Sequence, residues 1–275
     1  MSDVDPAHII HTRIWREVPE PDNAFATQAA YCRGYDVFGE MVGKARWIEM
    51  LVLLFRDDLP AKPALDMLEA LAVALANPGP RDPSIHAAMS GGVCGSTAAA
   101  ALMAALSVGA GHNGGARDVF DAMTLWNEAG TDTDAWLALS RKVQPVDIFP
   151  AAEHPPGFEQ HGVSTSTIVR QLIATLVAIC ATPKLSWLAE NRSQLEQKMG
   201  LPLALSGVAA AVLADLEFTP VQGEMLFLLL RLPGAAAHAL EQRQYGYRQF
   251  PFYPVELQDD PATRGQQLEP RGEKQ

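Results

Sequence analysis

The stretch from Ser90 to Met123, SGGVCGSTAAAALMAALSVGAGHNGGARDVFDAM, predicts two helices joined by a glycine-rich turn. Ser96 is the candidate cap of the first helix, and the alanines that follow it have high helix propensity and permit close backbone packing. Glycines at 109, 111, 114 and 115 then interrupt the helical pattern, which places His112 and Asn113 on a tight, exposed turn. The second helix is expected to start near Asp118. Such a turn is suited to binding a ligand.

Length and composition indicate one helical domain. The 275 residues are enough to bury a substantial core, and abundant alanine and leucine with few alternating β-branched runs favour an all-α protein. We expect a single domain over residues 1–254 and a flexible tail over residues 255–275, where the composition turns polar. The formal net charge of −11 disfavours nucleic acid or an anionic membrane surface as a partner, since both require basic patches.

The cysteines and the apolar runs favour a cytoplasmic protein. Cys32, Cys94 and Cys180 are odd in number, widely spaced and set in apolar contexts, which predicts buried free thiols in a reducing compartment. Their spacing does not match a metal site. The acidic start, Met1 to Asp5, does not resemble a signal peptide. The longest apolar runs are shorter than the roughly 18 residues that a membrane-spanning helix needs.

Helix signals recur along the rest of the chain. Leucines at 65, 68, 71 and 75 repeat at intervals of three and four, which predicts an amphipathic helix that ends before Asn77. Thr219-Pro220 has the pattern of a helix cap followed by a first-turn proline. The other expected helices are Leu51 to Pro60, Asp118 to Gly130, Asp134 to Lys142, Ile168 to Cys180, Leu185 to Met199, Leu205 to Leu216 and Val221 to Arg231, with an irregular loop over residues 144–162.

Several motifs resemble the citrate synthase superfamily, and especially its citryl-CoA lyase branch. HNGGARDVF at 112–120 resembles the HGGAxE loop, RGYD at 33–36 resembles an element near the start of that fold, and PGF at 156–158 lies where the superfamily has PGFGH. Residues 218–242, FTPVQGEMLFLLLRLPGAAAHALEQ, resemble FTPxFAxxRxxGWxAHxxEQ. The resemblance spans most of residues 12–250. It implies a citrate synthase-type helical bundle whose homodimer interface would use the small-residue helices Ser96 to Gly109 and Leu205 to Leu216.

The resemblance also implies chemistry on a CoA thioester. In the superfamily a carboxylate takes a proton from the methyl group of the thioester, one histidine stabilises the enolate, a second polarises the ketone, and arginines hold carboxylates. A carbon acid this weak needs both a positioned base and a donor at the oxygen where charge develops. The backbone of Pro156, Gly157 and Phe158 is the implied contact to CoA. No metal or redox cofactor is implied.

The two histidine positions of the superfamily do not hold histidine here. Alignment on Gly-Gly-Ala puts Asn113 at the enolate-stabilising position, with His112 one residue early. Alignment on Pro-Gly-Phe puts Gln160 at the second histidine, with His161 one residue late. Asparagine and glutamine donate hydrogen bonds but do not titrate near neutral pH. An active enzyme would therefore use His112 and His161 as displaced groups, with Glu159 as the nearest spare carboxylate.

Three further positions depart from the pattern. Alignment on Ser206-Gly207 puts Leu203 where the superfamily has its aspartate base, and leucine cannot act as a base. Pro78 replaces a histidine that contacts substrate, and Met89 stands where an arginine is expected. Arg248 resembles the C-terminal arginine that the superfamily lends to the partner subunit's site. Together these departures indicate that the usual mechanism is absent.

Two functional hypotheses remain open from the sequence. The first is a divergent carbon–carbon lyase or acyltransferase that acts on a CoA thioester and a carboxylate substrate. The second is a catalytically silent homologue that binds an acyl-CoA or carboxylate, or serves as a structural or regulatory subunit of an active paralogue. Either protein would be a homodimer or a hetero-oligomer with that paralogue. Fold alone does not decide between them.

Overall fold

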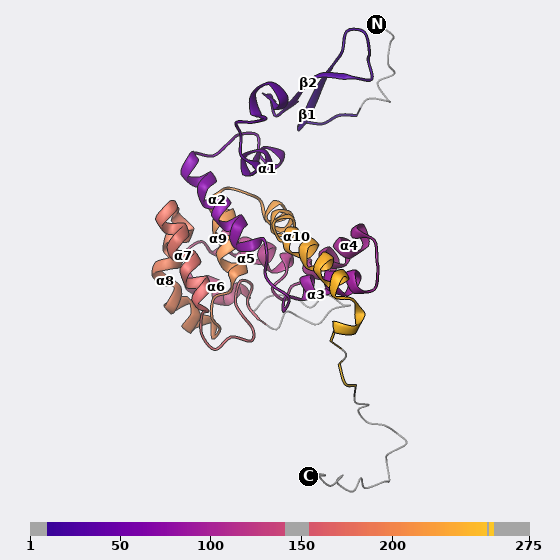
Figure 1. The fold of residues 1–275 in the computed structure, drawn as a ribbon. Coiled ribbons are helices and arrows are strands. Elements are labelled where there is room, and N and C mark those ends of the chain that lie inside the picture. The colour runs from indigo at the N-terminus through magenta and orange to yellow at the C-terminus, as the bar shows by residue number, and fades with distance from the viewer. Residues whose placement is uncertain (1–9, 141–153, 252, 256–275) are drawn as a thin grey trace.

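The computed structural model describes residues 10–140, 154–251 and 253–255, which form a helical body with a small N-terminal module at one end (Figure 1). The all-α prediction is confirmed for the body. Its helices are α1 (Trp47–Phe55), α2 (Lys62–Leu75), α3 (Pro83–Val93), α4 (Ala98–Gly109), α5 (Ala116–Ala129), α6 (Thr133–Ser140), α7 (Thr167–Ile179), α8 (Pro183–Met199), α9 (Leu205–Asp215), α10 (Pro220–Tyr245) and the short η3 (Tyr247–Gln249).

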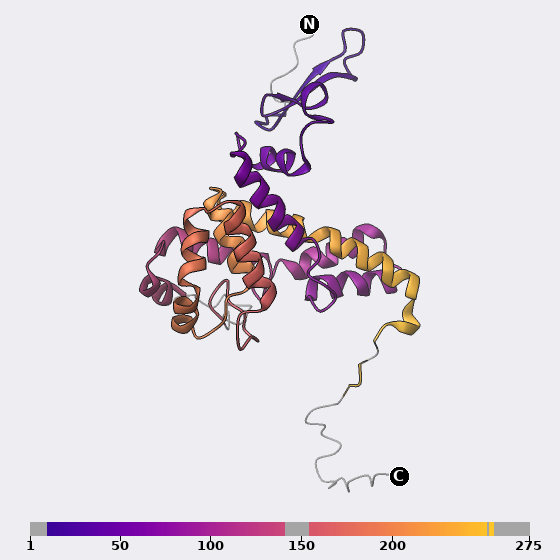
Figure 2. The ribbon, with the colours of Figure 1, turned by 60° about the vertical axis from the view of Figure 1, so that its left-hand side comes forward.

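The N-terminal module contains a small sheet that the sequence did not predict. Strands β1 (Trp15–Pro19), β2 (Thr27–Cys32) and β3 (Tyr35–Asp36) pair antiparallel in that order and lead into a π-helical turn, η2 (Val37–Met41). The hairpin leaves most side chains of β1 exposed or half-buried, so the strand lacks the clean polar–apolar alternation that identifies a half-buried strand. Figure 2 shows the module projecting from the helical body.

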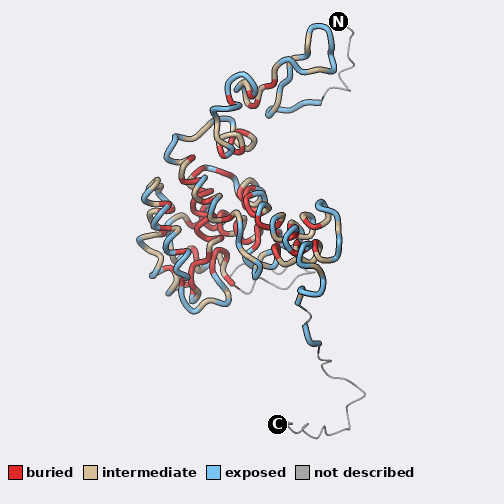
Figure 3. Tube along the Cα trace, viewed as in Figure 1, coloured by how far each residue is buried: buried red, intermediate tan, exposed pale blue. Residues whose placement is uncertain are grey.

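The main core of the body surrounds α9. Every residue from Ser206 to Ala214 is buried, mainly against α5 and α8 (Figure 3). The prediction of a central buried helix is therefore confirmed. The same burial corrects the interface prediction for this helix, because its small side chains already pack inside one chain and leave no free face for a second subunit.

Helices α3, α4 and α10 form a second cluster built on small side chains. Gly92 of α3 lies so close to α10 that an added Cβ would collide with the backbone carbonyl of Ala239. Ala101 and Ala105 of α4 are buried in the same cluster. The small residues of the stretch 90–123 thus permit α3, α4 and α10 to approach one another closely, as the sequence predicts.

Several helix ends differ from the prediction. Helix α1 ends at Phe55 rather than Pro60, and Thr97 rather than Ser96 caps α4 by accepting a hydrogen bond from the Ala100 amide. Helix α10 does not end at Arg231 but continues to Tyr245 through Pro233. Pro233 lies on the exposed side of the helix, and the amide that follows it, Gly234, donates to the Ala76 carbonyl after α2 at 2.7 Å.

Other boundaries are confirmed within a residue or two: α2, α7, α8 and α9, the stop of α5 before Gly130, and the cap at Thr219. Helix α5 begins at Ala116, two residues before the predicted start. Lys142, most of the loop over 144–162 and the tail from residue 256 lie outside the described residues.

The three cysteines are free thiols, as predicted, but they are not all buried. Cys32 is buried, Cys180 is half-buried, and Cys94 is exposed because it follows the end of α3. No helix in the described part of the chain is long and apolar enough to cross a membrane. Among the same residues, no cluster of histidine, cysteine and carboxylate side chains is arranged to hold a metal ion.

Candidate functional site

The glycine-rich turn between α4 and α5 holds the predicted imidazole in place. His112 precedes α5, and its Nδ1 lies 3.1 Å from Oδ2 of Asp121 on that helix. The His112 side chain is 42% exposed. Gly115 must be glycine because a Cβ there would meet the backbone of Gly111. Asn113 is exposed. The turn therefore presents His112 with one ring nitrogen fixed by a carboxylate and the other available.

A buried arginine fixes the same turn from α10. Arg231 Nη1 donates to the Gly114 carbonyl at 3.1 Å, and the guanidinium lies 4.8 Å from the centre of the Phe227 ring. Its Nη2 pairs with Asp82, which also caps α3 through the Ser84 amide at 2.9 Å. Burial lowers the pKa of Arg231, and the Asp82 charge opposes that shift. The buried cation is thus already neutralised by a carboxylate of this chain.

The PGF turn is buried rather than open. Pro156, Gly157 and Phe158 are all buried, and Phe158 forms a β-bridge with Leu203. The Gly157 carbonyl accepts from the Ala204 amide at 2.9 Å. These bonds fasten the turn to the segment before α9. The implied CoA contact through the Gly157 carbonyl would have to share that oxygen with Ala204.

The two turns meet through Asp118, a residue that the sequence analysis did not select. Asp118 is 3% exposed, and its Oδ1 accepts a hydrogen bond from the Gly157 amide at 3.0 Å. The buried His154 Nε2 lies 3.7 Å from the same oxygen. Asp118 Oδ2 and the Ser206 hydroxyl are also buried, and neither makes a hydrogen bond of normal geometry within the described residues. Asp118, His154 and Ser206 form a buried polar cluster, called the Asp118 cluster below.

The burial of Asp118 changes its titration. Removal from water raises the pKa of the carboxyl from 3.8 to about 7, and the negative charges of Asp121 and Glu159 add to the rise. The Gly157 amide and the nearby Ser206 hydroxyl oppose it. A carboxyl group with such a pKa is one that an enzyme could use as a base, but this one has almost no exposure to solvent or ligand.

Leu203 occupies an apolar environment at the position where the resemblance implies an aspartate. It is 3% exposed and pairs with Phe158, and an added Cβ on Gly207 would lie 2.9 Å from its Cδ1. Gly157 and Gly207 are in backbone contact, because a Cβ on Gly157 would lie 2.9 Å from the Gly207 Cα. The described residues therefore leave no space between the PGF turn and α9 at this point.

The other predicted site residues lie at the surface. Glu159 and His161 are exposed and Gln160 is half-buried, and the His161 amide donates to Glu159 Oε1 at 3.3 Å. Arg248 lies on η3, beyond the C-terminal end of α10. It is separated from Arg231 by roughly 20 Å of helix at 1.5 Å per residue. The structure therefore joins the two turns but does not bring Arg248 to them within one chain, and the roles of these residues remain predictions.

A cavity of about 610 Å³ opens directly after the PGF turn. It is lined by residues 162–165, by Arg170 of α7 and by the C-terminal half of α8. Arg192 Nη1 pairs with Glu196 Oε2 at 2.7 Å, whereas Arg170 makes no ion pair within the described part of the chain. The cavity thus combines a size suited to a small-molecule ligand with one guanidinium free for an anionic group.

The fold and the two joined turns define a citrate synthase-type helical protein. The solved structure of citryl-CoA lyase from Hydrogenobacter thermophilus is similar to this chain, with a TM-score of 0.67 and 20% identity over 92% of this chain and 98% of that one. ATP citrate lyase from Methanothrix soehngenii, in complex with citrate and coenzyme A, is similar with a TM-score of 0.67 and 17% identity over 94% of this chain.

A mutant of Methanosaeta concilii ATP citrate lyase in complex with (3S)-citryl-CoA is also similar, with a TM-score of 0.65 and 17% identity over 93% of this chain. This chain spans 43% of the length of each ATP citrate lyase chain. No family model matches the sequence, and no curated protein matches it. At these identities the likeness establishes the fold, which agrees with the fold that the sequence motifs imply.

Proposed function

We propose that this protein is a divergent citryl-CoA lyase-like homologue that binds a CoA thioester in the cavity after the PGF turn and does not catalyse the carbon–carbon bond reaction with the superfamily's usual groups. The pairing of Arg231 with Asp82 is the observation that supports the proposed lack of catalysis. Arg231 is the guanidinium that contacts the HNGGA turn, through the Gly114 carbonyl, and it cannot hold a substrate carboxylate there without leaving Asp82 uncompensated. The apolar packing of Leu203 supports the same conclusion.

The CoA part of the proposal rests on charge and position. CoA carries several phosphate charges, so a chain of net charge −11 needs a local cation to bind it. Arg170 supplies an unpaired guanidinium at the mouth of the cavity that adjoins the PGF turn. Two of the similar proteins are described in complex with coenzyme A or citryl-CoA, which supports the same ligand class for this fold.

Calorimetric titration of the full chain with CoA and acetyl-CoA tests the binding. We expect saturable binding that Arg170→Gln weakens about tenfold, since a charged hydrogen bond is replaced by a neutral one. Lys44→Gln is the matched control, because it removes the same charge from an exposed position that does not line the cavity. Wild-type protein that binds neither ligand, or equal loss in both variants, contradicts the proposed site.

An assay of citryl-CoA cleavage, followed as acetyl-CoA release, tests the proposed lack of catalytic activity. We expect no release above the rate in buffer. A second candidate function, an active lyase with displaced groups, is favoured by one observation, the His112–Asp121 contact, which leaves the other ring nitrogen available to an enolate oxygen. Release of acetyl-CoA that His112→Ala abolishes would establish that function instead.

We also propose that the protein pairs with a second copy or a homologous subunit through α10 and α4. Val221, Met225 and Leu240 on α10 are more than half exposed, and Met103 of α4 is 61% exposed. Exposed apolar side chains in series along a helix are typical of an interface. Light scattering on the purified protein tests this: we expect a dimer that Met225→Asp converts to a monomer, and a wild-type monomer would point to a missing homologous subunit.

A further inference from the structure

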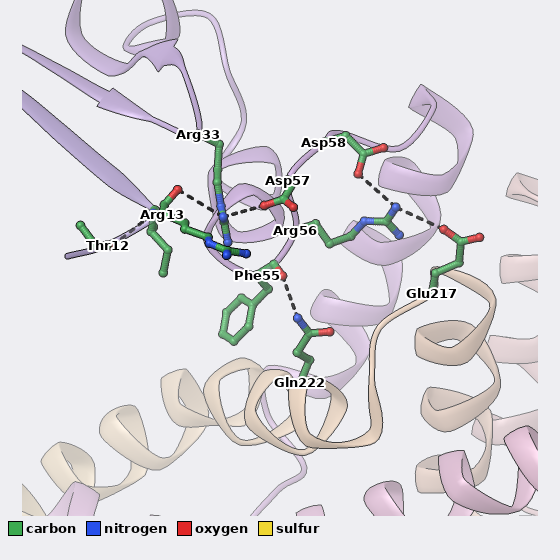
Figure 4. Close-up of a pocket in the computed structure, with 10 residues that line it drawn as sticks. Thr12, Arg13, Arg33, Phe55, Arg56, Asp57, Asp58, Glu217 and Gln222 are labelled. Atoms are coloured by element: carbon green, nitrogen blue, oxygen red, sulfur yellow. Dashed lines mark hydrogen bonds and ion pairs between the residues drawn. The ribbon is translucent and has the colours of Figure 1, made fainter.

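A second cavity, of about 550 Å³, lies where the N-terminal module meets the helical body (Figure 4). Its lining comes from four separated parts of the chain: the segment before β1, the β2–β3 turn, the end of α1 with its connection to α2, and the turn from α9 into the start of α10. Arg13, Arg33 and Arg56 contribute to this lining, and we call the cavity the arginine pocket. None of its residues belongs to the site described above.

Two of the three guanidiniums are held by backbone carbonyls. Arg33 donates through Nε to Leu53 O at 3.3 Å and through Nη1 to Arg13 O at 3.2 Å. Arg56 Nη1 donates to the carbonyl of Leu216 at the end of α9. The side chains of Arg33 and Arg56 are only 14% and 17% exposed. Their positions are therefore fixed by neutral groups of the fold and do not depend on an acidic partner.

The carboxylates that face these guanidiniums are exposed. Arg33 pairs with Asp57 at 2.6 Å, and Arg56 pairs with Asp58 at 3.2 Å and Glu217 at 3.3 Å. The three carboxylate side chains are 86%, 72% and 80% exposed. Ion pairs with partners so exposed contribute little free energy, so another anion can replace them at small cost.

The third guanidinium, that of Arg13, has no acidic partner among the residues that the structure describes. Arg13 is exposed and makes no ion pair within the described part of the chain, although it lines the same cavity as Arg33 and Arg56. The cavity lining also carries Asp57, Asp58 and Glu217, so the charge of Arg13 is the one of the three without a carboxylate on it among the described residues. The opposite wall carries Gln222, whose side-chain amide is occupied by the Phe55 carbonyl at 2.7 Å.

Backbone strain is concentrated at the same place. Arg33 and Glu217 are the two non-glycine residues with positive φ among those that the structure describes, at +51° and +60°, and both line the arginine pocket. Such conformations are costly for residues other than glycine and tend to persist at functional sites. Their coincidence at one cavity is independent of the charge argument.

We infer that the arginine pocket binds a small multivalent anion, with Arg13, Arg33 and Arg56 contacting its oxygens in place of the exposed carboxylates Asp57, Asp58 and Glu217. The planar guanidinium matches the oxygens of both carboxylate and phosphate groups, so the ligand is a polycarboxylate or a phosphate compound. Because the three arginines come from the module and from the α1–α2 connection, and Arg56 also binds α9, a bound anion would join the module to the helical body. This inference does not depend on the proposed CoA binding.

Calorimetric titration of the full chain with inorganic pyrophosphate and, separately, with citrate tests the inference, and the tighter of the two identifies the ligand class. We expect Arg13→Gln to weaken binding about tenfold, since it removes one charged contact without removing any described bond. Lys44→Gln, the same change of charge within the same module but outside the pocket, should leave binding unchanged.

The Asp57→Asn variant distinguishes an anion-binding site from arginines that only stabilise the fold. We expect it to strengthen binding several-fold, because the competing carboxylate on Arg33 is removed while the backbone bonds of that arginine stay. The inference is overturned if the wild-type protein binds neither anion, if Arg13→Gln binds as the wild type does, or if Asp57→Asn weakens binding.

Discussion

The Asp118→Asn variant should remove the pH dependence of stability that the buried Asp118 carboxyl gives the wild-type protein. Asparagine has the shape of aspartate, and its side-chain carbonyl can accept the hydrogen bond that the Gly157 amide now gives to Asp118 Oδ1. The substitution therefore removes the ionisation and keeps the contact between the two turns. What changes is the free energy needed to keep a carboxylate in a site that is 3% exposed.

The size and sign of this pH effect on the free energy of unfolding follow from the pKa shift of Asp118. The folded-state pKa of Asp118 is about 7, against 3.8 for an ordinary aspartate. Below the lower value both states hold the proton; between the two values the folded state keeps a proton that the unfolded state has lost, so raising the pH favours unfolding. At 1.36 kcal/mol per unit, a shift of about 3 units lowers the free energy of unfolding by about 4 kcal/mol by pH 7, with no further loss above it.

Urea denaturation at pH 5, 6, 7 and 8 measures the effect. The free energy of unfolding of Asp118→Asn, minus that of the wild type, should rise by about 1.4 kcal/mol per pH unit between pH 5 and pH 7 and level off above pH 7. The exposed Asp22→Asn in the β1–β2 turn is the matched control and should give a flat difference. A flat difference for Asp118→Asn as well would refute the burial argument.

Two further predictions concern contacts that hold the site. Gly207→Ala should lower the free energy of unfolding by about 2 kcal/mol, because the added Cβ meets the backbone carbonyl of Gly157. Gly223→Ala should lower it less, because the added Cβ meets a methionine side chain that can move. Equal losses of the two variants in urea denaturation would contradict this prediction. Arg231→Met should cost about 3 kcal/mol, since it leaves the half-buried Asp82 without its cation, and an unchanged melting temperature would argue against the pairing.

The helices could be predicted because their signals are local. The leucines of α2 repeat at helical spacing, and the run of small apolar residues in α9 identifies a buried helix wherever it packs. The hairpin before Arg33 could not be predicted in this way, since exposed strands carry a weak pattern. The extension of α10 through Pro233 depends on which side of the helix faces solvent, and that is decided by tertiary packing.

The Asp118 cluster could not be predicted because it is assembled from distant positions. Asp118 and Gly157 are 39 residues apart, and their hydrogen bond exists only when α5 and the PGF turn pack together. One signal was present: Asp118 occupies the acidic position of the HGGAxE pattern, within a helix face that is otherwise apolar. His112, the predicted site residue of this stretch, is partly exposed, whereas Asp118 is the buried titratable group.

Restoring a carboxylate at Leu203 alone should not restore a lyase. Leu203→Asp would place a carboxylate beside Phe158 in an apolar site, where burial raises its pKa and costs stability. Arg231 would remain paired with Asp82. Replacing Asp82 alone frees the guanidinium but leaves position 203 without a carboxyl group to protonate the enolate that forms when citryl-CoA is cleaved. Because the reaction also needs donors at the oxygens where charge develops, and Asn113 and Gln160 replace the two histidines there, neither Leu203→Asp nor its combination with Asp82→Ser should release acetyl-CoA from citryl-CoA.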